Sequence, residues 1–93
     1  MQDQSLDGWR KQIDDVDLRL LELLVERMTI STHIGTYKAD NKLPALDEKR
    51  WKEVLSSRNT IGTDLGLTSK LIEDVFDVIH QHSLSVQELE SNK

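Results

Sequence analysis

Apolar residues recur every three or four positions between Trp9 and Tyr37, which is the spacing of one face of an α-helix. The positions of this stripe are Trp9, Ile13, Val16, Leu20, Leu23, Ile30, Ile34 and Tyr37. No glycine or proline interrupts the stretch before Gly35. The pattern predicts one long helix over residues 9–38. Pro44 disfavours helical backbone at the residue before it, so this helix should end by about residue 41.

Two shorter helices are predicted after Pro44, the last of them about 20 residues long, and small polar residues mark where each helix begins. The candidate N-caps are Ser5 or Asp7 for the first helix, Asp47 for the second, and Thr68 or Ser69 for the third. Gly66 is suited to cap the C-terminal end of the second helix. The fold class is therefore all-α, with one long and two shorter helices. We expect a single domain over residues 1–93, with an ordered core of about 6–90.

The first predicted helix is longer than a compact monomer of this chain would be wide. Thirty helical residues span about 45 Å at 1.5 Å per residue, which exceeds the width of a compact chain of 93 residues. Such a helix needs a partner surface along its length. An intertwined helical homodimer would provide one.

Polar residues interrupt the apolar faces of the first and third helices. Arg27 occupies the position after Leu23 where an apolar residue is expected, and Lys38 lies about 20° around the helix and about 16 Å along it. Ser83 and Gln87 interrupt the third helix in the same way. Burying a guanidinium costs free energy unless an anion meets it, and buried hydroxyl and amide groups need hydrogen-bond partners. A structural ion pair explains Arg27 as well as a bound anionic ligand does.

Two further arginines extend this argument. Arg10 lies roughly 25 Å along the helix from Arg27 and about 100° around it, so one small molecule cannot reach both within one helix. Arg10 is therefore either ordinary surface or part of a site built with another chain. Arg50 falls in the first turn of the second helix, where the helix dipole disfavours a cation. That placement again suggests an external anion.

Composition narrows the classes of partner and chemistry. The net charge of −5 argues against nucleic acid, because phosphate binding needs a basic surface. Cysteine is absent, so no disulfide or thiolate chemistry is expected. His80 and His82 are two residues apart on a helix and point to different faces, so no metal site is expected. Neither a membrane span nor a signal peptide is evident, and we expect a cytoplasmic protein.

The sequence resembles the all-helical chorismate mutase family from about Leu6 to Glu90. The segments that carry the resemblance are WRKQIDDVDLRLLELLVERM, IGTYK, LPALDEKR and SLSVQ, with the spacing between them preserved. The resemblance implies an intertwined three-helix homodimer. It also implies an isomerase that converts chorismate to prephenate without a cofactor, in phenylalanine and tyrosine biosynthesis.

The resemblance also implies a role for each polar position. Arg27 would bind one substrate carboxylate, and Arg10 of the other protomer would bind the second. Lys38 and Gln87 would donate to the ether oxygen of the breaking bond. Asp47 would accept from the ring hydroxyl, partly through its backbone, while Arg50 and Ser83 would complete the pocket near the carboxylates.

Trp51 departs from the family pattern, which usually has a glutamate here that accepts from the ring hydroxyl. Glu48, one turn earlier, could replace that glutamate, and Trp51 either covers the pocket or packs outside it. Three alternatives therefore stay open beside chorismate mutase activity: a mutase of an aminated chorismate, an isochorismate pyruvate lyase, and a non-enzymatic helical interaction module. The sequence is equally compatible with a free-standing enzyme and with one domain of a larger one.

Overall fold

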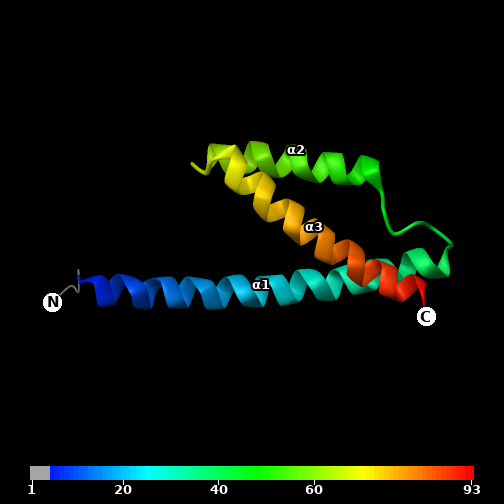
Figure 1. Ribbon diagram of the computed structural model, residues 1–93, viewed down its shortest axis with the longest axis horizontal. Coiled ribbons are helices and arrows are strands. Elements are labelled where there is room, and N and C mark those ends of the chain that lie inside the picture. Colours follow the sequence, from blue (N-terminus) through cyan, green and yellow to red (C-terminus); the bar gives the residue numbers. More distant parts are fainter. Residues whose placement is uncertain (1–4) are drawn as a thin grey trace. The chain divides into compact units, whose positions relative to one another are not determined.

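The computed structural model describes residues 5–93 and contains three α-helices (Figure 1). Helix α1 comprises Leu6–Asp40, α2 comprises Glu48–Asp64, and α3 comprises Ser69–Ser91. The described residues include no β-strand. The predicted all-α class and the three helices are confirmed, and α1 ends at Asp40, as the position of Pro44 requires.

Side-chain caps start each helix where the sequence predicted them. The backbone N–H of Gly8 donates to Ser5 Oγ at 3.2 Å, and that of Arg50 donates to Asp47 Oδ1 at 3.0 Å. Thr68 caps α3 by accepting from the backbone N–H of Leu71 at 3.2 Å. These bonds satisfy amide hydrogens that have no partner within the first turn of a helix.

The C-terminal end of α2 differs by one residue from the prediction. The C-cap is Leu65, and Gly66 follows it with a φ of 101°, in the left-handed region that favours glycine. The N–H of Leu67 then donates back to the carbonyl oxygen of Gly62 at 3.0 Å, which closes the last turn. Gly66 therefore occupies the position after the C-cap, where its left-handed backbone ends the helix.

The chain divides into two units, Met1–Ile30 and Ser31–Lys93. The first unit is helical from Leu6 onward, and its large apolar side chains are exposed. Trp9 and Ile13 expose 52% and 59% of their surface. The other exposed apolar residues of this unit are Leu6, Val16, Leu18, Leu20, Leu21, Leu23, Leu24, Val25 and Ile30. The apolar stripe of this unit is therefore a surface that faces solvent in the single chain.

In the second unit, α2 and α3 run in opposite directions and contact each other (Figure 1). Val54 and Ile72 are the buried apolar residues among those described, with exposures of 7% and 3%. Gly62 lies against the Ile72 side chain, where a Cβ would overlap it. The last ten residues of α1, from Ser31, are joined to α3 by side-chain hydrogen bonds. This contact between the end of α1 and α3 positions the candidate site.

Within residues 5–93, no helix combines the length and the apolar character that crossing a membrane requires.

Candidate functional site

Lys38 and Gln87 meet at the contact between the end of α1 and α3. Lys38 Nζ donates to Gln87 Oε1 at 2.7 Å and to the carbonyl oxygen of Ala45 at 2.7 Å. Both side chains are half-buried. Lys38 lies in the last turn of α1, where the helix dipole favours a cation. The structure thus joins two residues that the sequence related only through the family resemblance.

The orientation of the Gln87 amide follows from the chemistry of its partner. An ammonium group only donates hydrogen bonds, so the amide oxygen must be the atom that faces Lys38. The amide nitrogen, with its two hydrogens, is therefore turned away from Lys38. Two of the three ammonium hydrogens are used by Ala45 and Gln87, which leaves the third as a donor. The pair thus keeps donors available on two helices.

Ser83 is 5% exposed and forms a buried hydroxyl pair with Ser31. The Ser31 hydroxyl donates to Ser83 Oγ at 3.2 Å across the contact between α1 and α3. The polar interruption of the α3 face at Ser83 therefore has a partner within the chain. A role of Ser83 in ligand binding stays a prediction.

Asp47 and Arg50 lie together in the first turn of α2. One oxygen of the Asp47 carboxylate accepts from the backbone N–H of Arg50, and the Asp47 carbonyl accepts from the N–H of Trp51 at 2.9 Å. The guanidinium of Arg50 is 3.9 Å from the carboxylate of Glu53, and both side chains are more than half exposed. Such a surface pair stabilises little. The Arg50 cation is thus accessible to an external anion.

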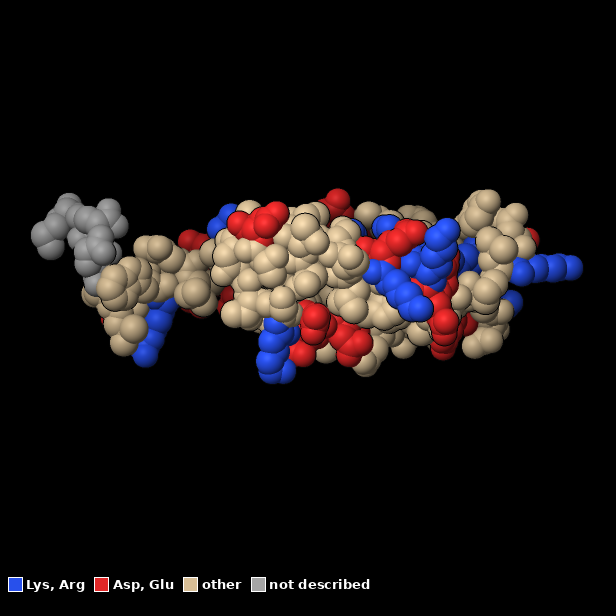
Figure 2. Space-filling model, turned by 90° about the horizontal axis from the view of Figure 1, so that it is seen from above, with Lys and Arg blue, Asp and Glu red and all other residues tan. Residues whose placement is uncertain are grey.

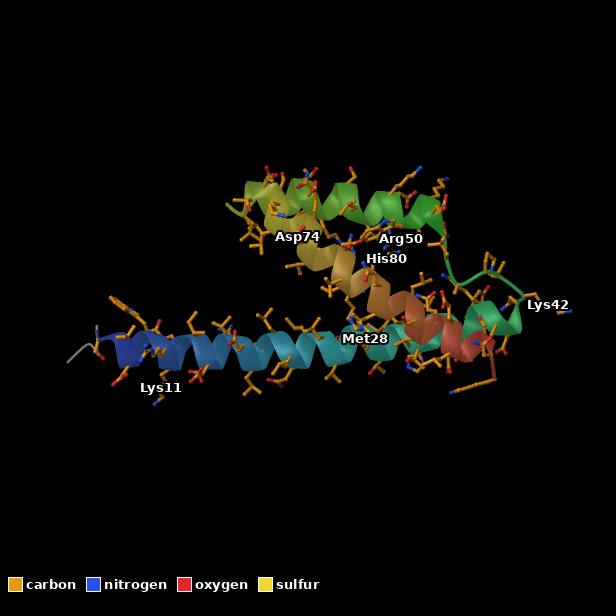
Figure 3. All side chains as sticks on the ribbon, viewed as in Figure 1. Lys11, Met28, Lys42, Arg50, Asp74 and His80 are labelled. Carbon is orange, nitrogen blue, oxygen red and sulfur yellow. The ribbon has the colours of Figure 1, made fainter. Side chains whose placement is uncertain are left out.

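Trp51 packs against α3 through an aromatic stack on His80, whose place on α3 is labelled in Figure 3. The centroids of its indole and the His80 imidazole are 3.9 Å apart, and the ring planes differ by 11°. Both residues are half-buried. Position 51 therefore offers a stacked aromatic ring where the resemblance leads us to expect a carboxylate.

Arg10 and Arg27 belong to the first unit. Arg10 is 3.9 Å from the carboxylate of Asp7, with side-chain exposures of 68% and 93%. Arg27 is half-buried. Their predicted roles toward two substrate carboxylates stay predictions.

Glu90 forms a third polar link between α1 and α3. Its carboxylate accepts from the Thr36 hydroxyl at 3.0 Å and pairs with Lys93 Nζ at 2.6 Å. The hydrogen bond from Lys93, followed by that from Thr36, holds the pKa of the Glu90 carboxyl below its ordinary value. This link flanks the Lys38–Gln87 bond one turn further along α3.

Several parts of this site were missed by sequence reasoning, namely Ser31, the Ala45 carbonyl and His80. The small residues Ser31 and Gly35 lie one helical turn apart, and that spacing is the signal that could have located the α3 contact. No comparable signal marks Ala45 or His80.

The described residues contain no group of three or more side chains placed to hold a metal ion. On the face that Figure 2 shows, Lys and Arg side chains lie among Asp and Glu side chains and form no broad basic surface.

The family model that matches this chain is described as chorismate mutase type II, and the match covers residues 9–88. Among curated proteins, the chain is 36% identical over 79 residues to a T-protein of Enterobacter agglomerans. That alignment covers 85% of this chain and 21% of the relative.

The chain is also 30% identical over 83 residues to the bifunctional chorismate mutase/prephenate dehydratase of Buchnera aphidicola subsp. Baizongia pistaciae, with 89% of this chain and 22% of the relative covered. A T-protein of Haemophilus influenzae is 29% identical over 72 residues, which cover 77% of this chain and 19% of the relative. The chain thus spans about a fifth of the length of the curated relatives that it matches.

Proposed function

Because this chain belongs to the family of type II chorismate mutases, which are isomerases, we propose that it rearranges chorismate to prephenate in aromatic amino acid biosynthesis. The observation that carries the proposal is the Lys38–Gln87 pair, whose hydrogen bond leaves an ammonium hydrogen and the amide N–H groups as donors on two adjacent helices. Chorismate is a dicarboxylate with an ether oxygen in the bond that breaks. The pair supplies donors suited to that oxygen.

The chemistry needs little more than positioning and charge stabilisation. A Claisen rearrangement is unimolecular and transfers no proton, so it requires no acid–base pair. The enzyme must hold the compact, chair-like conformer and stabilise the negative charge that develops on the ether oxygen as the C–O bond breaks. Preorganised donors do both, because they need no reorientation at the moment of reaction.

The remaining residues would bind and orient the substrate. Arg27 pairs with one carboxylate, and Arg50 lies near the carboxylate end of the pocket, where its exposed guanidinium supports such a role. The carboxylate of Asp47 already caps α2, and each of its oxygens has more than one lone pair, so it can still accept from the ring hydroxyl. Ser83 would line the pocket between these groups.

We propose that the active form is an intertwined homodimer with two shared sites. The support is the exposed apolar stripe of the first unit, which includes Trp9 and Ile13 and exceeds what a monomer in water usually leaves uncovered. A second copy of the same stripe is a matching apolar surface. Arg10 of the partner subunit would then bind the second carboxylate of the substrate.

A chorismate assay tests the proposed function directly. Purified protein is incubated with chorismate, and the loss of its ultraviolet absorbance is followed together with the appearance of prephenate. Lys38→Ala serves as the matched inactive control, because it removes the ammonium donor from the same site. Turnover that is lost in Lys38→Ala supports the proposal, whereas a folded parent protein that leaves chorismate unchanged contradicts it.

The Trp51–His80 stack favours one second candidate, a mutase or lyase that acts on a close analogue of chorismate. The stacked indole offers no carboxylate for a ring hydroxyl, so an aminated chorismate or isochorismate could be the better substrate. A panel with all three compounds separates these activities by their kcat/KM values.

A further inference from the structure

Gly35 is buried in α1 where the backbone of α3 packs closely against it. A Cβ at this position would be 2.8 Å from Gln87 Cα, 3.3 Å from Gln87 Cβ and 3.2 Å from Glu90 Cγ. The nearest of these atoms belongs to the backbone, so no side-chain rotation can remove the overlap. Glycine is a poor residue for a helix interior, and here it permits the two helices to touch.

Three hydrogen bonds cross the same contact on either side of Gly35. Ser31 bonds Ser83 at 3.2 Å on the preceding turn, and Lys38 bonds Gln87 at 2.7 Å on the following turn. Thr36, the next residue along, bonds Glu90 at 3.0 Å. The Ser31–Ser83 bond depends most directly on the separation between the helices, because both of its side chains are short. The other two bonds cross the same contact and lengthen if the helices move apart.

We propose that Gly35 is a positioning residue. Together with the Thr36–Glu90 hydrogen bond, it holds α3 at the distance at which Gln87 meets Lys38. In that position the amide nitrogen of Gln87 is directed toward the ligand. Gly35 acts through Gln87 and touches no ligand itself. The effect on catalysis rests on the proposed function, whereas the effect on the Lys38–Gln87 bond rests on the geometry of the chain alone.

Substitution of Gly35 tests the proposal. Gly35→Ala must push α3 away by a distance on the order of 1 Å, and a displacement of that size at reacting groups costs about 100-fold in rate. We expect kcat to fall by about this factor with a smaller change in KM, because the arginines still bind the carboxylates.

Gly62→Ala is the matched control. Gly62 is also buried in a helix interior, and a Cβ there also meets α3, but it contacts the Ile72 side chain and not Gln87. Both variants gain helix propensity and lose packing. Only Gly35→Ala should lower kcat strongly, and equal kcat losses in the two variants would overturn the proposal.

A double-mutant cycle separates positioning from a general structural effect. If Gly35 acts through Gln87, then Gly35→Ala has no further effect on kcat in a Gln87→Ala background. Multiplicative losses would instead assign Gly35 a role independent of Gln87 and overturn the proposal.

Thr36→Val provides a second probe if Gly35→Ala does not fold, since it adds no bulk and removes the bond to Glu90, together with the bond to the Thr32 carbonyl of its own helix. Its control is Thr29→Val, because the Thr29 hydroxyl bonds only the Val25 carbonyl of its own helix. We expect a fall in kcat for Thr36→Val that is absent from Thr29→Val. Equal kcat in the two variants counts against the proposal.

Crystal structures of the parent and Gly35→Ala proteins give a readout that does not need turnover. The distance from Lys38 Nζ to Gln87 Oε1 should lengthen beyond hydrogen-bond range in the variant. A parent without mutase activity would contradict the proposed function and leave this structural test intact. A variant that keeps the 2.7 Å bond and the parental kcat would overturn the positioning role.

Discussion

The indole of Trp51 on α2 lies flat against the imidazole of His80 on α3, with the ring centroids 3.9 Å apart. Aromatic pairs of this kind stabilise by about 0.5–1.5 kcal/mol beyond the area that they bury. The stack therefore fixes α2 to α3 beside Asp47 and Arg50. It does so with a side chain that cannot accept a hydrogen bond from a substrate hydroxyl.

Trp51→Glu is expected to raise kcat/KM for chorismate. The new carboxylate restores an acceptor for the ring hydroxyl, which is worth about 1 kcal/mol, or roughly fivefold. The variant also loses the stack on His80, so its unfolding midpoint should fall. Trp51→Leu is the control, since it loses the stack and adds no acceptor. If the kinetics of Trp51→Glu match those of the parent, Trp51 lies outside the site or Asp47 suffices.

The exposed apolar stripe of the first unit predicts an obligate homodimer. Sedimentation should find a dimer at micromolar concentration, and a stable, active monomer there would refute the assembly. Shared sites can be tested by refolding Arg10→Ala together with Arg27→Ala. About half of the dimers are then mixed. In each mixed dimer one of the two shared sites carries both substitutions and the other carries neither, so about a quarter of parental activity should return. If each site were instead confined to one protomer, the refolded mixture would regain no activity.

Arg27→Ala should reduce turnover severely while the chain still folds. A charge-assisted, bidentate pair with a carboxylate is worth several kcal/mol in a partly buried site, and its loss removes that stabilisation from the transition state. Arg27 is only half-buried, so its replacement by Ala should leave the chain folded. Arg19→Ala, at an exposed position of the same helix, is the control. An unfolded Arg27→Ala protein that regains full activity when stabilised would show that Arg27 is structural.

Glu90 should contribute a pH-dependent part of stability. Hydrogen bonds from Lys93 and Thr36 lower the pKa of its carboxyl in the folded chain. A carboxyl whose pKa is lower in the folded chain stabilises the fold when the pH is above its pKa in the unfolded chain. This contribution disappears as the pH falls through the pKa of the folded chain. Glu90→Gln should therefore be less stable than the parent at neutral pH, and the two should converge in acid. Unfolding midpoints measured against pH, with exposed Glu88→Gln as control, test this. If the unfolding midpoints of the parent and of Glu90→Gln differ by the same amount at every pH, the proposed contribution of Glu90 is contradicted.

The sequence predicts local features of this chain better than contacts between helices. Ser5, Asp47 and Thr68 act within their own first turns, so their capping bonds follow from residue type and neighbours alone. The close contact at Gly35 can also be expected from the sequence, because a glycine inside a helix suggests close approach by a neighbour. Which neighbour approaches depends on how α3 packs.

The partners of Lys38 and Trp51 show where sequence reasoning stops. The Ala45 carbonyl reaches Lys38 only because the loop after α1 turns back, and His80 reaches Trp51 only because α3 lies against α2. Neither partner has a residue type or spacing that marks it in advance. A resemblance can assign roles to Lys38 and Gln87, but their 2.7 Å bond is a property of the packed helices.

The last prediction concerns pH and the donors at Lys38 and Gln87. The amide of Gln87 does not titrate and the proposed rearrangement transfers no proton, so parental activity should be flat from mildly acidic to mildly alkaline pH. An enzyme that depends on an acid–base pair would instead show a bell-shaped profile.

Gln87→Glu should convert the flat profile into one that favours acid. A glutamate can donate to the ether oxygen only when protonated. In the parent chain the amide oxygen of Gln87 lies 2.7 Å from the Lys38 ammonium. A carboxyl in the same place would be favoured in its charged form, which shifts the active range to lower pH than an isolated glutamate would give. The loss at neutral pH should appear mainly in kcat, because the oxygen gains its charge in the transition state. Gln87→Leu, which is apolar and similar in length, should be impaired at every pH. A Gln87→Glu enzyme as flat in pH as the parent would mean that Gln87 does not touch the reacting oxygen.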